Sequence, residues 1–133
     1  PAPIDNNKRA PDDIKAQYPI GDMDRGIVYI ALLDGSKAQS TKDYPQWPVV
    51  VKTKSSSRHL FDKDSSDVIA YGELELTEAT AGDGMIEFTI PLDYRRTDLI
   101  PSSIVVTASA SKGGDYFCGG PSVMYLDDFE LVY

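Results

Sequence analysis

The residues best suited to a binding role are aromatic and polar side chains in two turn-rich stretches of the chain. One stretch is YPQWP, a loop stiffened by prolines, and the other follows the pair Gly113-Gly114. Sugars present apolar C–H faces edged by hydroxyl groups, so a sugar site combines a flat ring with polar groups within reach. The candidates for such a site are Tyr44, Gln46, Trp47, Arg95, Asp115 and Tyr116. The alternative is that Trp47 packs over one end of the core and that Tyr116 only leads into the last strand.

No combination of residues in the sequence predicts a catalytic site. The single histidine, His59, lies in a polar loop, and no His/Asp pair can be identified beside the single cysteine, Cys118. Asp127 and Asp128 are neighbours on a predicted strand, so their side chains point to opposite faces and cannot flank one glycosidic bond. A glycan-active enzyme is therefore the weakest alternative, because it needs two carboxylates about 5–10 Å apart in a cleft.

Asp127 is the candidate for a metal ligand. In the strand predicted from Tyr125 to the end of the chain, Phe129 and Leu131 are the best core candidates, and Asp127 shares their parity. Successive side chains point to opposite faces of a strand, so we expect Asp127 on the apolar side. An unpaired buried carboxylate is strongly unfavourable, so this position needs backbone donors, a cationic partner or a metal ion.

The composition limits the classes of partner. The chain has 133 residues, a formal net charge of −8 and one cysteine. Its length suits one domain with one core. Lys and Arg are scattered rather than clustered, so we expect no binding to nucleic acid or to an anionic membrane surface. No run of 18 apolar residues is present, so we also expect no membrane insertion of this segment.

The hydrophobic pattern predicts strands separated by turns, with no long helix. The stretch 27–33 is apolar on both faces, which is typical of a central, covered strand. The stretches 68–77 and 85–92 alternate, which is typical of half-exposed antiparallel strands. One face of the first carries Val68, Ala70, Gly72, Leu74 and Leu76, and its other face carries Ile69, Tyr71, Glu73, Glu75 and Thr77. The expected inner face of the second carries Ile86, Phe88, Ile90 and Leu92. Further strands are predicted over 49–53 and 103–111.

These elements favour an all-β protein, an antiparallel β-sandwich of jelly-roll type. We divide the chain into an irregular N-terminal segment or excursion, residues 1–25, and a β jelly-roll domain, residues 26–133. The N-terminal segment is expected to contain one helical turn over Ile14–Gln17 and to lie outside the core. Because the chain opens with Pro-Ala-Pro, we expect an upstream strand or domain to precede it.

The end of the chain resembles a known family. The stretch SASKGGDYFCGGPS at 109–122, followed by YLDDFEL at 125–131, is similar to the end of the Putative carbohydrate metabolism domain family. Its members close with a small-residue strand, a GD-x-F-x-G turn and a D-[DE]-x-E-[LI] strand. The stretches 27–33, 68–74 and 87–94 are also similar, so the resemblance covers roughly residues 24–133. Ala110 stands where Ser is usual, and Pro121 where Gly is usual.

This resemblance implies a β jelly roll that is similar to carbohydrate-binding modules. Such domains lie at the C-terminus of secreted or surface lipoproteins of gut Gram-negative anaerobes, often after an immunoglobulin-like domain, and no catalytic residues are established for them. Many jelly-roll carbohydrate modules hold a structural calcium near the last strand, and Asp127 suits that role by analogy. No other cofactor is implied.

We therefore expect a non-catalytic carbohydrate-binding domain outside the cytoplasm, at the cell surface. Its partners would be a glycan or polysaccharide, together with neighbouring surface proteins or an upstream immunoglobulin-like domain. The alternative is a structural or adhesion domain that mediates protein–protein contacts at the cell surface.

Overall fold

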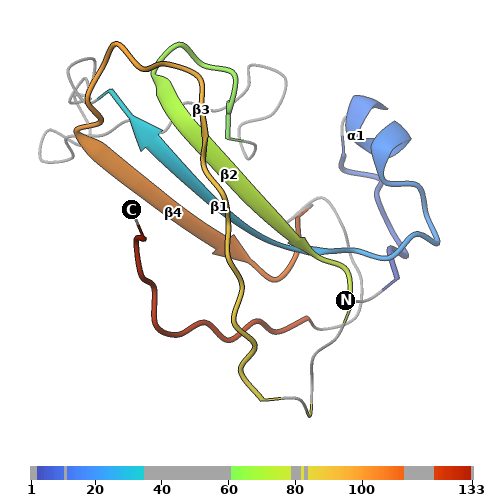
Figure 1. Ribbon diagram of the computed structural model, residues 1–133. Coiled ribbons are helices and arrows are strands. Elements are labelled where there is room, and N and C mark those ends of the chain that lie inside the picture. The colour runs from blue at the N-terminus through green and yellow to red at the C-terminus, as the bar shows by residue number, and fades with distance from the viewer. Residues whose placement is uncertain are drawn as a thin grey trace, which may run out of the picture.

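The computed structural model describes residues 3–10, 12–34, 61–78, 82, 84–112 and 122–132. These residues form one short helix, α1 (Asp12–Gln17), and four strands: β1 (Gly26–Leu33), β2 (Val68–Leu76), β3 (Asp93–Tyr94) and β4 (Ser103–Ser109). The strands form one antiparallel sheet in the order β3-β2-β1-β4 (Figure 1). The prediction of an all-β protein is confirmed.

β1 is the centre of this sheet. It pairs with β2 over its whole length and with β4 from Ile27 to Leu33. Its sequence, GIVYIALL, is rich in β-branched and apolar residues, which suit a strand that is covered on both faces. Val28 is buried on one face, and Ala31 is buried on the other. The predicted central strand is therefore confirmed.

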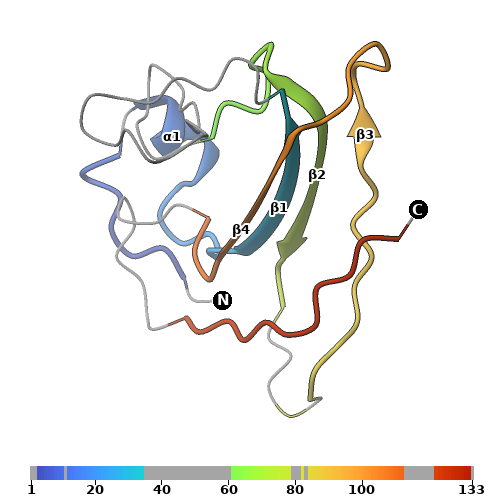
Figure 2. The ribbon, with the colours of Figure 1, turned by 90° about the vertical axis from the view of Figure 1, so that its left-hand side faces the viewer.

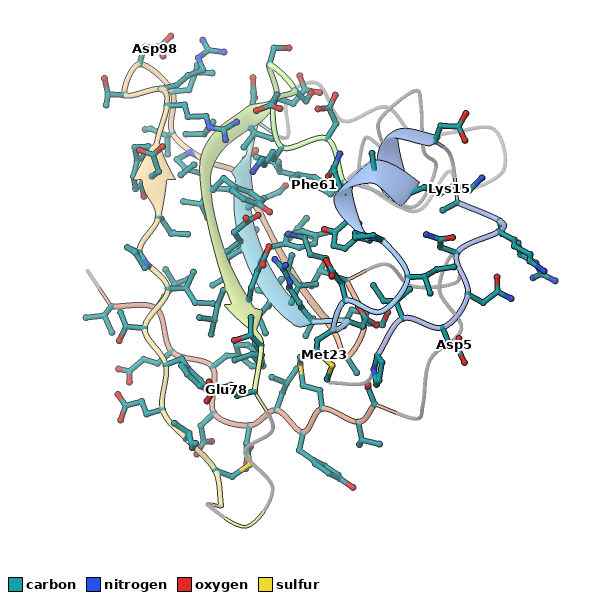
Figure 3. The ribbon with its side chains drawn as sticks, turned by 90° about the vertical axis from the view of Figure 1, so that its right-hand side faces the viewer. Asp5, Lys15, Met23, Phe61, Glu78 and Asp98 are labelled. Carbon is teal, nitrogen blue, oxygen red and sulfur yellow. The ribbon has the colours of Figure 1, made fainter. Side chains whose placement is uncertain are left out.

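The two faces of the sheet are covered by different parts of the chain. In Figure 2, α1 lies on one side of the sheet and the segment 84–92 lies on the other. We call these sides the helix face and the far face. The helix face carries a core cluster, and Figure 3 shows Phe61 on the α1 side of the sheet. The cluster consists of Ala31, Leu33, Val68 and Tyr71, with Tyr29, Phe61 and Val105 packed against it. The far face carries Val28, Ile30, Leu32, Gly72, Leu74, Ile104 and Val106.

Two glycines allow other segments to approach the far face closely. A Cβ atom at Gly72 would lie 2.5 Å from the carbonyl oxygen of Pro91 and 2.9 Å from Cγ2 of Ile90. A Cβ atom at Gly26 would lie 2.7 Å from the methyl carbon of Met124. At Gly72 the near atom belongs to the backbone, so glycine there is what lets the segment 84–92 lie against β2, whereas the end of the flexible Met124 side chain could move away from a larger residue at Gly26.

The N-terminal segment contributes to the buried interior, so the expectation that it lies outside the core is wrong. Ile4 and Ala10 are both buried. The N–H of Ile4 donates to the carbonyl oxygen of Asp22 at 2.7 Å, and its own carbonyl oxygen accepts from the N–H of Gly21 at 2.9 Å. These bonds satisfy the backbone of Ile4 where it is shielded from water. α1 also begins earlier than the predicted helical turn.

Two stretches predicted as strands do not form strands of the described sheet. Residues 84–92 and 122–132 pair with no described strand, and β3 contains only Asp93 and Tyr94. Phe129 and Leu131 have exposed fractions of 61% and 46%, and Phe88 of 48%, so their assignment to the core is wrong. Asp128 has a φ of 48°, which interrupts the regular alternation of an extended chain.

The described sheet is consistent with one layer of a β-sandwich, over which the segment 84–92 lies as part of a second layer. The jelly-roll type and the domain boundary at residue 25 stay predictions, and the predicted strand over 49–53 lies outside the described residues. In the described part of the chain, no helix is long and apolar enough to cross a membrane.

Replacing Gly72 tests whether the segment 84–92 packs against β2. Gly72→Ala forces Pro91 and the strand apart, and we expect it to lower the free energy of unfolding by about 1–3 kcal/mol in urea denaturation. Thr77→Ala, at an exposed position just after β2, is the control and should change stability little. Equal stability of Gly72→Ala and the wild type would contradict this packing.

Candidate functional site

Arg95 is fixed in place by the loop that precedes β2. Its N–H donates to the carbonyl oxygen of Ile69 at 2.9 Å. Its guanidinium donates to the carbonyl oxygen of Lys63 and lies 3.6 Å from Oδ1 of Asp64. The guanidinium carbon also lies 5.8 Å from the centroid of the Tyr71 ring. Arg95 is thus held against an aromatic ring, an arrangement that favours a cation.

Three aromatic rings pack together beside Arg95 on the helix face. The ring centroid of Tyr29 lies 5.2 Å from that of Phe61 and 5.9 Å from that of Tyr71. The centroids of Phe61 and Tyr71 are 6.1 Å apart. Tyr29 and Tyr71 come from adjacent strands, and Phe61 comes from the loop before β2. Stacked rings at these separations stabilise one another beyond their area of contact.

The hydroxyl group of Tyr71 links this aromatic group to charged residues. It donates to Oε2 of Glu73 at 2.7 Å. Nζ of Lys63 lies 3.8 Å from the same carboxylate oxygen and 5.6 Å from the Tyr71 ring centroid. Burial, and then the hydrogen bond to Glu73, raise the pKa of the Tyr71 phenol above its ordinary value of 10.0. We call this group the Tyr71 cluster; its members are Tyr29, Phe61, Lys63, Tyr71, Glu73 and Arg95.

Glu75 holds a second charged group, at the opposite end of β2. It accepts a hydrogen bond from Lys112 and one of 2.9 Å from Nη1 of Arg25. The hydrogen bonds from Lys112 and from Arg25 lower the pKa of Glu75 below its ordinary value. The N–H of Lys112 also donates to the carbonyl oxygen of Arg25 at 2.7 Å. The three residues tie together the start of β1, the end of β2 and the chain that leaves β4.

The Tyr71 cluster lies where the chain enters and leaves residues 35–60. The N–H of Asp34 donates to the carbonyl oxygen of Asp67 at 2.9 Å, and Phe61 itself belongs to the cluster. Three predicted sugar-site residues, Tyr44, Gln46 and Trp47, belong to 35–60 and lie outside the described residues. Arg95 therefore lies beside the aromatic group that contains Phe61, the residue that follows this segment.

The other two candidates, Asp115 and Tyr116, also lie outside the described residues. The segment that contains them begins after Lys112, which is bonded to Arg25 at the start of β1. β1 has eight residues, and a strand of that length spans about 26 Å. The structure therefore places Arg95 and Lys112 at opposite ends of the sheet.

Asp127 is exposed, and its Oδ1 accepts the N–H of Asp128 at 3.0 Å. The expectation that it faces an apolar interior is wrong. Calcium takes about six to eight oxygen ligands. Among the residues that the structure describes, no group of three or more His, Cys, Asp or Glu side chains could hold a metal ion. Calcium binding at Asp127 stays a prediction.

The sequence identified Arg95 but not the residues around it. Tyr71 shares a face of β2 with Glu73 and Glu75, as the alternation predicts, and it is buried. Two carboxylates beside a tyrosine attract basic side chains, so this pattern could have indicated a charged group here. The contact between Arg95 and Lys63 joins residues 32 positions apart, and no local pattern in the sequence reveals such a pair.

The arrangement of the Tyr71 cluster suits binding. A guanidinium carries five N–H donors in a planar fork, and 32% of the Arg95 side chain is exposed. Its position over Tyr71 and beside Asp64 holds this fork in one orientation. A hydroxyl-rich ligand at this end of the sheet would meet an oriented cation beside an aromatic group.

The model of the family described as Putative carbohydrate metabolism domain matches residues 11–132. The chain belongs to this family. The match confirms the resemblance drawn from the terminal motif, and it makes the protein a domain related to carbohydrate metabolism. Searches of curated proteins and of solved structures found no match.

Glu75→Gln should remove a pH-dependent part of the stability. At pH 7 we expect a loss of about 1–2 kcal/mol in the free energy of unfolding, because a charge-assisted pair of hydrogen bonds is lost. The pKa of Glu75 is lowered in the folded state, so its contribution is complete above its ordinary value of 4.5 and is lost as the pH falls through the lower value.

Urea denaturation of both proteins between pH 3 and pH 7 measures this difference. Asp98→Asn is the control, because Asp98 forms an exposed ion pair with Arg96 on the outer rim (Figure 3) and should contribute little. A difference between wild type and Glu75→Gln that stays constant down to pH 3 would contradict the role assigned to Glu75.

Tyr71→Phe should keep the ring and lose the hydrogen bond to Glu73, at a cost of about 1 kcal/mol. Since the folded-state pKa of Tyr71 is raised, folding favours the neutral phenol, and this contribution is lost as the pH rises above 10.0. Absorbance titration of the folded proteins at pH 11 should therefore give equal phenolate signals for the variant and the wild type. In urea the wild type should ionise one tyrosine more. A larger folded-state signal in the wild type would show that Tyr71 is accessible.

Proposed function

We propose that the protein is a non-catalytic carbohydrate-binding domain, and that its glycan site lies at the end of the sheet where Arg95 is held. The observation that carries this proposal is the oriented, partly exposed guanidinium of Arg95 beside the aromatic group at Phe61, where residues 35–60 end. In the proposal, Trp47 and Tyr44 stack on the sugar, and Arg95 and Gln46 hold its hydroxyl groups. The family supports the ligand class, since it is a carbohydrate metabolism domain.

Asp115 and Tyr116 form a separate part of the proposal. Their segment starts at the Glu75 end of the sheet, so a long glycan would reach both groups and a short one would reach only the first. This makes glycan length an informative variable in a binding experiment. We also propose that the domain works outside the cytoplasm, at the cell surface, where polymeric glycans are available.

A second candidate function, a domain that contacts other proteins at the cell surface, is favoured by one observation. The far face of the sheet and the segments over it carry several exposed large apolar side chains. Such a concentration of apolar residues is typical of an interaction surface.

A glycan array tests the first proposal, followed by calorimetry with the best ligand. We expect Trp47→Ala to weaken binding about tenfold or more, because it removes the largest stacking surface. Arg95→Ala should also weaken binding, whereas Arg96→Ala is a matched control that removes a neighbouring, exposed arginine paired with Asp98. Circular dichroism of each variant shows whether the fold is retained.

Two results would count against this assignment. One is a broad array without any bound glycan. The other is binding that Trp47→Ala and Arg95→Ala leave unchanged. Repeating the titration with EDTA tests the predicted calcium: a lower melting temperature with unchanged affinity would assign the ion a structural role.

A further inference from the structure

Two extended segments carry exposed apolar side chains along the far face of the sheet. They are residues 84–92 and 122–132, neither of which pairs as a strand with any described residue. The first contacts β2 at Gly72, and the second contacts the start of β1 through Met124. Figure 2 shows the segment 84–92 on the far side of the sheet, and the segment 122–132 running below the sheet from the α1 side to the far side, where the chain ends.

β4 is the strand whose far face is least covered. Ile104 and Val106 point to this face and have exposed fractions of 46% and 45%. Their partners on β1 are Leu32, which is buried, and Ile30, which is half-buried. The cover over the far face therefore reaches β2 and β1 but leaves β4 in contact with solvent. We give one name, the β4 patch, to six exposed apolar residues of β4 and of the two segments; its members are Ile86, Phe88, Ile104, Val106, Phe129 and Leu131.

The charges on the two segments have one sign. Residues 84–92 and 122–132 contain four carboxylates, Glu87, Asp127, Asp128 and Glu130, and neither Lys nor Arg. All four of these residues are exposed. Such a set of charges repels an acidic partner and attracts a basic one. A second copy of this chain, with its net charge of −8, brings the same carboxylates to the patch.

We propose that the β4 patch binds an extended strand of a partner protein in which apolar residues alternate with Lys or Arg. The apolar residues of that strand pack on Ile104 and Val106, and its backbone pairs with the segments 84–92 and 129–132. Its basic residues lie beside the four carboxylates. Addition of a strand to unpaired extended chain is a common mode of peptide recognition, in which backbone bonds give affinity and alternate side chains give specificity. This interface lies on the far face and does not rest on the glycan proposal.

A peptide pair tests the proposal directly. The probe is the nine-residue peptide acetyl-TVKVTVKVT-amide carrying a fluorophore, and its control is acetyl-TVEVTVEVT-amide. Fluorescence anisotropy should show binding of the Lys peptide at least about tenfold tighter than binding of the Glu peptide, and higher salt should weaken it. Hydrogen exchange should show slower exchange of the amides of residues 86–92 and 129–132 when the Lys peptide is bound.

Variants separate the apolar and the charged contributions. The double variant Phe88→Ser with Leu131→Ser should lose most of the affinity, and because both side chains are half exposed it should keep the fold. Ile20→Ser, at an equally exposed apolar residue of the N-terminal segment, should bind like the wild type. The variant Glu87→Lys with Glu130→Lys should lose the preference for the Lys peptide, because two lysines then balance Asp127 and Asp128.

Three outcomes would overturn the proposal. The first is no binding of the Lys peptide, or equal binding of the two peptides, by the wild type. The second is binding without protection of the amides of residues 86–92 and 129–132. The third is a dimer in sedimentation experiments that the double serine variant abolishes, because the patch would then serve a second copy of the chain.

Discussion

The pairing of β1 on both of its edges is the constraint on which the described structure depends. β1 is bonded to β2 on one side and to β4 on the other, so both of its backbone edges are used within the sheet. Its two faces are used as well, because Ala31 enters the core on the helix face while Val28 and Leu32 are covered on the far face. A strand with no free edge and no free face can vary little in position. It therefore fixes where every neighbouring segment begins and ends.

β2 carries the residues around which the two charged groups of the sheet form. Tyr71 and Glu75 lie on the same face of β2, four positions apart, and each recruits basic residues from distant parts of the chain. At one end Lys63 and Arg95 gather round Tyr71, and at the other Arg25 and Lys112 gather round Glu75. The carboxylates of both groups, Glu73 and Glu75, remain partly accessible to water, which limits the cost of their desolvation.

The central strands could be predicted from the sequence, but the packing of the segments 84–92 and 122–132 over them could not. β1, β2 and β4 were found because an apolar run or an alternation is a property of the strand itself. The stretch from Tyr125 was misassigned because alternation indicates which residues share a face and not whether a partner strand is present. Asp128 has a positive φ angle, in the left-handed region that aspartate tolerates, and no pattern in the sequence predicts this conformation. In the candidate site, the sequence predicted Arg95. It did not predict the hydrogen bond from Arg95 to the carbonyl oxygen of Lys63, because the two residues are far apart in sequence.

The two faces of the sheet present different chemistry, and this difference bears on function. The helix face ends in an aromatic and ionic cluster whose hydrogen bonds hold the Arg95 guanidinium in one orientation, which is what recognition of hydroxyl groups requires. The far face offers apolar side chains bordered by carboxylates, which suit a basic, extended polypeptide and not a sugar. Because β1 separates the two faces, a ligand on one does not obstruct the other. The glycan and the protein partner that we propose would therefore meet different faces of the sheet.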